Sequence, residues 1–116
     1  MIRIYHNSRC SKSRGALALL EQHGKPFETI HYLETPPTDA ELKALLSQLG
    51  ITARQLLRTG EDEYRELGLD DPSLTEQALI TAMTKHPRLI ERPIVVANGS
   101  AVIGRPPEKV LDILRS

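Results

Sequence analysis

The fold is set by residues 2–33, IRIYHNSRCSKSRGALALLEQHGKPFETIHYL. The apolar alternation at residues 2–5 predicts a short β-strand. Apolar residues then recur at helical spacing over residues 13–23, and Gly24 is placed to end that helix. β-type residues over 27–33 predict a second strand. A strand, a helix and a strand in this order form a βαβ unit, whose two strands should be parallel.

The middle of the chain predicts a helical block. Residues 38–41 and 73–76 have the spacing of capping boxes, with the first residue of each as the expected N-cap. Another short helical piece is expected over residues 53–57, and the acidic run at 61–63 is expected to be a solvated surface. These segments together predict a helical insertion over about residues 38–90.

β-type sequence returns at residues 93–97 and again at 101–103, with the hairpin-turn signal Asn98-Gly99 between them. Pro106-Pro107 fits the first turn of a final helix. The predicted order is therefore β-α-β, a helical insertion, and β-β-α. That order indicates an α/β thioredoxin-like fold with a mixed sheet, in one domain covering residues 1–116.

Composition narrows the classes of function. Lys plus Arg and Asp plus Glu both number 15, and this balance argues against nucleic-acid partners, which require a basic surface. No apolar run has the length of a membrane span, and the N-terminus lacks the profile of a signal peptide, so no membrane partner is expected. A single cysteine without an export signal favours a reducing compartment, and we expect a cytoplasmic protein.

Cys10 is the only cysteine, so no disulfide can form within the chain. It lies between the first predicted strand and the following helix, where the helix N-terminus favours a thiolate. Its polar and cationic neighbours should lower the thiol pKa further; they are Arg9, Ser11, Lys12, Ser13 and Arg14. The alternative is a buried, inert cysteine, but apolar neighbours would be typical of that. We therefore predict a nucleophilic thiol.

Two common cysteine patterns do not apply to this loop. A dithiol redox site requires a second cysteine three residues after Cys10, and that position is Ser13. A phosphatase-type anion loop requires arginine six residues after the cysteine, and that position is Ala16. The product of an attack by Cys10 must therefore be resolved by another molecule.

Three arginines stand at segment ends: Arg58, Arg92 and Arg105. Arginine carries a permanent charge and a planar fork of donors that suits tetrahedral oxyanions. If the three converge on Cys10, they form an oxyanion site; the alternative for each is a solvated surface charge. His6 lies near Cys10 and can orient the loop or help to form the thiolate. No set of histidines has metal-ligand spacing, so we expect no metal site.

Motifs in a fixed order extend over nearly the whole chain. They are IYHN leading to Cys10, YLETPP (32–37), LLR (56–58), LGL (67–69), HP (86–87), RPIVV (92–96), RP (105–106) and VLDIL (110–114). In these motifs the chain resembles the ArsC family of glutaredoxin-linked arsenate reductases, including its shorter, YfgD-like members. It departs from the familiar pattern at Ser8-Arg9 and Ser11-Lys12, where other members carry smaller, less basic residues.

The resemblance implies a thioredoxin-like fold with a helical insertion, and it places the family's nucleophile on Cys10. It also implies that the three arginines bind the oxyanion, that His6 helps to lower the thiol pKa, and that the Arg92–Pro93 bond is cis. Ser13, Arg14 and Pro93 are the expected supporting residues.

The implied reaction is the reduction of arsenate to arsenite. The Cys10 thiolate attacks arsenate and water leaves; glutathione then attacks the adduct, and glutaredoxin resolves the mixed disulfide. No bound cofactor is expected, and glutathione is a co-substrate. Two alternatives stay open. One is a non-catalytic interaction module like the Spx regulators, which usually carry a second cysteine where this chain has Ser13. The other is a glutathione-dependent thiol enzyme acting on another small substrate.

Overall fold

The computed structural model describes residues 2–114, so Met1, Arg115 and Ser116 of the predicted domain lie outside the described residues. The chain divides into two compact units, Met1–Thr35 with Arg92–Ser116, and Pro36–Glu91. The second unit covers nearly the segment that the sequence assigns to a helical insertion. No helix within residues 2–114 combines the length and the apolar character needed to cross a membrane.

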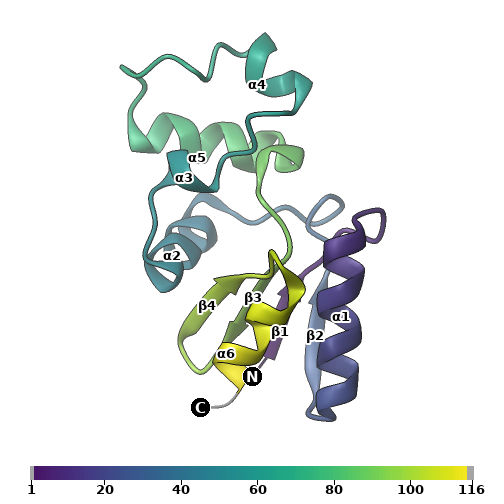
Figure 1. The fold of residues 1–116 in the computed structure, drawn as a ribbon. Helices are drawn as coiled ribbons and strands as arrows, with labels where there is room; N and C mark the ends of the chain where they lie inside the picture. Colours follow the sequence, from purple (N-terminus) through teal and green to yellow (C-terminus); the bar gives the residue numbers. More distant parts are fainter. Residues whose placement is uncertain (1, 115–116) are drawn as a thin grey trace. The chain divides into compact units, whose positions relative to one another are not determined.

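The first unit contains a four-stranded mixed sheet (Figure 1). Its strands are β1 (Ile2–Tyr5), β2 (Phe27–Ile30), β3 (Ile94–Ala97) and β4 (Ser100–Ile103), in the order β2-β1-β3-β4. β1 is parallel to β2 and antiparallel to β3, and β3 is antiparallel to β4. The predicted βαβ unit and the following hairpin are therefore present, and together they form one sheet.

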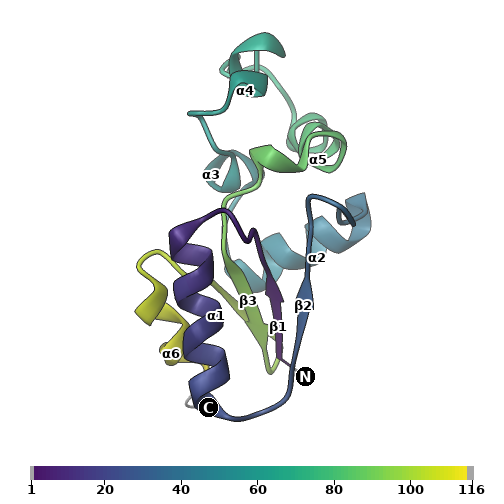
Figure 2. The same ribbon diagram turned by 90° about the vertical axis from the view of Figure 1, so that its right-hand side faces the viewer.

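Two helices cover the same face of this sheet (Figure 2). They are α1 (Ser11–His23) and α6 (Val110–Leu114), the second preceded by a 3-10 turn, η2 (Pro107–Lys109). Their apolar side chains pack with those of β1 and β3 in one core, formed by Ile4, Ala16, Leu20, Val95, Val110 and Leu114. This core holds the N-terminal end of α1, and with it Cys10, against the sheet.

The β3–β4 hairpin has the turn that the sequence predicts. Asn98 and Gly99 both have positive φ, 54° and 78°, which is the conformation that a two-residue hairpin of this twist requires. After the hairpin, Gly104 allows a close approach of backbone to the core. A Cβ atom at Gly104 would lie 3.0 Å from Cγ of Pro93 and 3.2 Å from Cγ2 of Val110. The segment from β4 to Arg105 is thereby packed closely against Pro93.

Two predicted boundaries in this unit are wrong. Strand β2 ends at Ile30 rather than at residue 33, because the chain turns there and the His31 carbonyl accepts hydrogen bonds from the backbone of Glu34 and Thr35. Helix α1 begins at Ser11 rather than at residue 13. Cys10 is consequently the N-cap residue itself, with extended backbone angles.

The second unit is helical. Its elements are α2 (Asp39–Leu49), α3 (Ala53–Leu56), α4 (Asp62–Glu66), α5 (Glu76–Lys85) and the 3-10 turn η1 (Pro87–Leu89). The capping box at the start of α2 is confirmed, with both reciprocal hydrogen bonds between Thr38 and Glu41. Asp39 links two of the helices, because its carboxylate accepts hydrogen bonds from Gln77 and Thr84 of α5. Helix α4 and the turn η1 were not predicted.

The predicted second capping box is wrong. Thr75, not Ser73, is the N-cap of α5, and its side chain accepts a hydrogen bond from the backbone of Ala78. Ser73 instead bonds to the Asp71 carboxylate through both its hydroxyl and its backbone N–H. Both groups of Ser73 are therefore bonded within a local turn with Asp71, and its hydroxyl does not cap the helix.

The acidic run at 61–63 is not a uniformly solvated surface. Asp62 is exposed, but the side chains of Glu61 and Glu63 are only 16% and 18% exposed. Both lie near the Arg88 guanidinium, at 3.5 and 3.8 Å. Glu61 and Glu63 are thus partly buried beside Arg88. Because Arg88 lies 25 or more residues later in the chain, no local sequence pattern indicates this contact.

Candidate active site

Cys10 lies at the junction between the sheet and α1. Its backbone N–H donates to the Asn7 carbonyl, and its own carbonyl accepts from the backbone of Arg14 in the first turn of α1. The thiol is partly exposed. No acidic residue occupies the first turn of α1, so no carboxylate there opposes a negative charge on the sulfur.

The surroundings of Cys10 favour the thiolate. Partial burial alone would raise the pKa of the Cys10 thiol. Hydrogen bonds from the backbone N–H groups of Ser13 and Lys12 and from the Arg92 side chain, together with the charge of Arg92, lower that pKa to below its ordinary value. A lower pKa leaves a larger fraction of the thiol ionised at neutral pH, and the thiolate is the form that acts as a nucleophile.

Two of the predicted arginines meet at this sulfur. Nη1 of Arg105 lies 3.9 Å from Sγ of Cys10, and it also donates a hydrogen bond of 3.2 Å to the Arg92 carbonyl. Each arginine precedes a cis proline: the expected cis bond Arg92–Pro93 is confirmed, and Arg105–Pro106 is cis as well. The structure thus places two guanidinium groups beside one thiol.

His6 and Ser13 form a buried pair behind the loop. His6 is 4% exposed and Ser13 is fully buried, and Nδ1 of His6 lies 2.6 Å from the Ser13 hydroxyl oxygen. The same oxygen accepts a hydrogen bond from the Asn7 backbone at 3.0 Å. Because burial, His31 and Arg14 lower the pKa of His6 and outweigh an opposing hydrogen bond with Ser13, a neutral ring can accept the Ser13 hydroxyl proton. His6 thus contacts the hydroxyl of Ser13, the residue whose backbone N–H donates to the Cys10 sulfur.

Arg14 supports the loop from outside. Its Nη1 donates to the Ser8 carbonyl at 2.9 Å, so this cation is bonded to the backbone of the loop. Arg9 and Lys12 are exposed on either side of Cys10. Of the predicted supporting residues of the first unit, Ser13 and Arg14 contact the cysteine loop, whereas Pro93 packs against Gly104.

Arg58 lies in the second unit, two residues after the end of α3. Its Nη1 forms an ion pair of 2.8 Å with Oε1 of Glu91, and its backbone N–H donates to the Leu89 carbonyl. The bridge between Leu57 and Ile90 holds these two segments together. The convergence of Arg58 with the other two arginines stays a prediction. Glu91 was missed, because a carboxylate 33 residues away gives no spacing signal.

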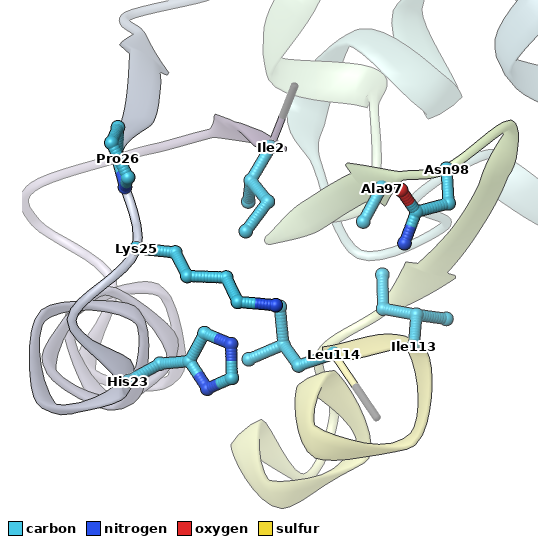
Figure 3. Close-up of a pocket in the computed structure, with 8 residues that line it drawn as sticks. All are labelled: Ile2, His23, Lys25, Pro26, Ala97, Asn98, Ile113 and Leu114. Atoms are coloured by element: carbon cyan, nitrogen blue, oxygen red, sulfur yellow. The ribbon is translucent and has the colours of Figure 1, made fainter. Parts of the chain in front are cut away.

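A pocket adjoins the cysteine loop. We call this cavity of about 340 Å³ the loop pocket; it is lined by His6, Asn7, Ser8, Arg9, His31, Leu33 and Glu34. It was missed because residues 31–33 were expected to continue the strand. A second cavity, of about 310 Å³, includes His23 and Lys25 at the opposite end of α1 from Cys10 (Figure 3). No group of three or more metal-ligating side chains occurs within residues 2–114.

Known proteins match this chain closely. YfgD from Escherichia coli (strain K12), a protein of uncharacterised function, is 58% identical over 114 residues, which cover 97% of this chain and 96% of YfgD. An arsenate reductase of Neisseria meningitidis serogroup A is 52% identical over 114 residues, with 97% of both chains covered. The structure of an arsenate reductase from Vibrio cholerae superposes with a TM-score of 0.94 at 55% identity, covering 97% of this chain and 96% of that one.

The fold and the family follow from these matches. The close structural agreement confirms the thioredoxin-like α/β fold that the order of elements predicts. A family model described as the ArsC family matches residues 5–113, a range that includes Cys10 and all three predicted arginines. This chain therefore belongs to the ArsC family.

Proposed function

We propose that this protein is an arsenate reductase, an oxidoreductase in which Cys10 is the nucleophile. The observation that carries the proposal is the position of the Cys10 sulfur: it lies at the N-terminus of α1, its pKa is lowered, and the guanidinium groups of Arg92 and Arg105 lie beside it. The names of the relatives from Neisseria meningitidis and Vibrio cholerae support arsenate as the oxyanion.

In the first step, arginine side chains bind the arsenate oxygens and neutralise their charge. Arg92 and Arg105 act beside the sulfur, and Arg58 is the proposed third arginine. The Cys10 thiolate attacks arsenic, an S–As bond forms, and one oxygen leaves as water after protonation. Arsenic stays in its +5 state. The fixed cations stabilise the charge that develops on the oxygens, which is where such donors contribute most.

The remaining steps need two external thiols, because the chain has no second cysteine. The glutathione thiolate then attacks arsenic and forms a second S–As bond, and a second arsenic-bound oxygen is protonated and leaves as water. A glutaredoxin thiolate then attacks the glutathione sulfur, and the electron pair of that S–As bond stays on arsenic, reducing it to +3. Water cleaves the bond to Cys10 and releases arsenite. We place this cycle in the cytoplasm, where reduced glutathione is available.

The test is arsenate-dependent oxidation of NADPH in the presence of glutathione, glutaredoxin and glutathione reductase. We expect turnover that is abolished in Cys10→Ser and reduced about 10²–10³-fold in Arg92→Gln, the usual loss for a donor to developing charge. Lys43→Gln, an exposed substitution in α2, is the control and should leave turnover unchanged. If the unmodified protein oxidises no more NADPH than Cys10→Ser, the assignment to arsenate is wrong.

A further inference from the structure

The loop pocket contains one positively and one negatively charged side chain, and neither is paired with another of the described residues. Arg9 and Glu34 both line it and both are exposed. Within residues 2–114, neither side chain forms an ion pair or a hydrogen bond with another residue. A cation and a carboxylate in one cavity, each without an internal partner, are suited to a ligand that itself carries both signs of charge.

The pocket is held in shape before any ligand arrives. On one side, four hydrogen bonds fix the loop that leads to Cys10. The backbone N–H of Asn7 donates to the Ser13 hydroxyl, and the Asn7 side chain and carbonyl accept from the backbone N–H groups of Arg9 and Cys10. The Arg14 guanidinium donates to the Ser8 carbonyl. On the other side, the His31 carbonyl closes the turn through Glu34.

The two sides of the pocket are also tied to each other. The His6 backbone donates to the Ile30 carbonyl at 2.9 Å, and the His6 and His31 rings meet edge to face with centroids 5.9 Å apart. Because its walls are already ordered, such a cavity loses little conformational entropy when a small ligand binds, and this favours affinity.

The position of the pocket connects it to the chemistry of Cys10. Residues 6–9 form one wall, and the next residue along the chain is the cysteine. A ligand held between this wall and the segment 31–34 therefore lies next to the loop that carries the sulfur. The volume of about 340 Å³ is within the range of small-molecule sites.

We propose that the loop pocket binds glutathione, the thiol co-substrate, and so this inference rests on the proposed function. Glutathione carries two carboxylates, one ammonium group and a thiol. Arg9 binds a carboxylate, Glu34 binds the ammonium group, and the partly exposed Leu33 contacts the apolar part of the cysteinyl residue. The thiol is thereby presented to the arsenic adduct on Cys10. Arsenate itself fits this pocket less well, because the Glu34 carboxylate repels a doubly charged oxyanion.

A binding experiment tests the site without relying on turnover. S-methylglutathione, which has no free thiol, is titrated into the ¹⁵N-labelled full chain. The expected result is a set of saturable amide shifts confined to residues 6–10 and 31–35, weakened about tenfold in Arg9→Gln and in Glu34→Gln, the size of one charged contact. The matched controls Lys43→Gln and Glu21→Gln, which remove charge at exposed helical positions, should not change the shifts. Shifts confined to the cavity of His23 and Lys25, or no shifts at all, would overturn the proposal.

Steady-state kinetics separate this site from the proposed function. In the coupled assay, Arg9→Gln and Glu34→Gln should raise KM for glutathione about tenfold and leave KM for arsenate and kcat at saturating glutathione unchanged. If KM rises for glutaredoxin instead, the residues contact the protein partner and the glutathione site is wrong. Saturable binding of S-methylglutathione without arsenate turnover would retain the site and reject the arsenate assignment. Arsenate turnover with unchanged KM values in both variants would retain the arsenate assignment and reject the glutathione site.

Discussion

The lowered pKa of the Cys10 thiol results from a small number of contacts. Backbone N–H groups of the first turn of α1 and the Arg92 side chain stabilise the thiolate, while partial burial opposes it. Arg105 is also within reach of the sulfur, but at 3.9 Å its contact is at the outer limit of a hydrogen bond to sulfur. We therefore infer that Arg92 contributes more to the thiolate than Arg105 does.

This ranking can be measured by alkylation. The rate at which iodoacetamide modifies Cys10, followed against pH, should show an apparent pKa below that of a free thiol, about 8.5. Arg92→Gln should raise this apparent pKa more than Arg105→Gln, because Arg92 lowers it through both a hydrogen bond and its charge, whereas Arg105 contacts the sulfur only at 3.9 Å. Lys43→Gln is the control. A midpoint in the native protein equal to that of the urea-unfolded chain would show that the fold does not activate the thiol.

At the scale of elements, helix starts are set by single side chains. Thr38 caps α2 and Thr52 caps α3, each with a reciprocal bond from the third residue of its helix, and Thr75 caps α5. Cys10 occupies the same position at α1, where the backbone N–H groups of Lys12 and Ser13 face a sulfur instead of a hydroxyl oxygen. The position at which other helices carry a capping hydroxyl or carboxylate is therefore occupied at α1 by a thiol, and the same N–H groups favour its ionised form.

The start of α5 distinguishes the observed cap from the predicted one. Thr75→Ala should lower the free energy of unfolding by about 1 kcal/mol, because the backbone N–H of Ala78 loses its acceptor. Ser73→Ala should change it by less than about 0.5 kcal/mol, since Ser73 is exposed and bonds only to Asp71. Urea unfolding of both variants provides the measurement. A larger loss in Ser73→Ala than in Thr75→Ala would restore the predicted capping box.

For the whole molecule, local patterns predicted most of the first unit. The βαβ unit, the Asn98-Gly99 hairpin and the final helix follow from periodicity and turn chemistry, which are local in the sequence. The contacts that position the site are not local: Arg105 reaches Cys10 across 95 residues, and Arg58 pairs with Glu91 across 33. Cys10 and the arginines could be predicted from their positions at the ends of segments, whereas their partners could not, because the partners are distant in the sequence.

Boundaries failed where tertiary contacts outweighed propensity. The β-type residues Tyr32 and Leu33 leave the strand because the chain turns at His31, and Tyr32 is buried in that turn. The loop pocket exists only because of this turn, so the sequence could not indicate it. Glu61 and Glu63 were likewise misassigned, since their partner Arg88 lies far along the chain.

The buried His6 should make the stability of the protein depend on pH. Because the pKa of His6 in the native protein lies below its ordinary 6.5, the unfolded chain binds more protons as pH falls below 6.5. The contribution of His6 to stability is complete above that pH and is lost as pH decreases toward the native pKa, with a slope of at most about 1.4 kcal/mol per pH unit. Urea unfolding at a series of pH values should show this loss, and His6→Gln should remove it. An unchanged slope in the variant would assign the pH dependence to other groups.

The hydrogen bond between Arg105 and the Arg92 carbonyl has a consequence for the thermodynamics of oxyanion binding. A free arginine side chain has about 2 kcal/mol of rotamer entropy to lose when it is immobilised. In this protein that loss occurs during folding, because Nη1 of Arg105 is already held between the carbonyl and the Cys10 sulfur. The Arg105 side chain therefore has little conformational entropy left to lose when an oxyanion binds beside the thiol. The entropic cost of oxyanion binding should be smaller for that reason.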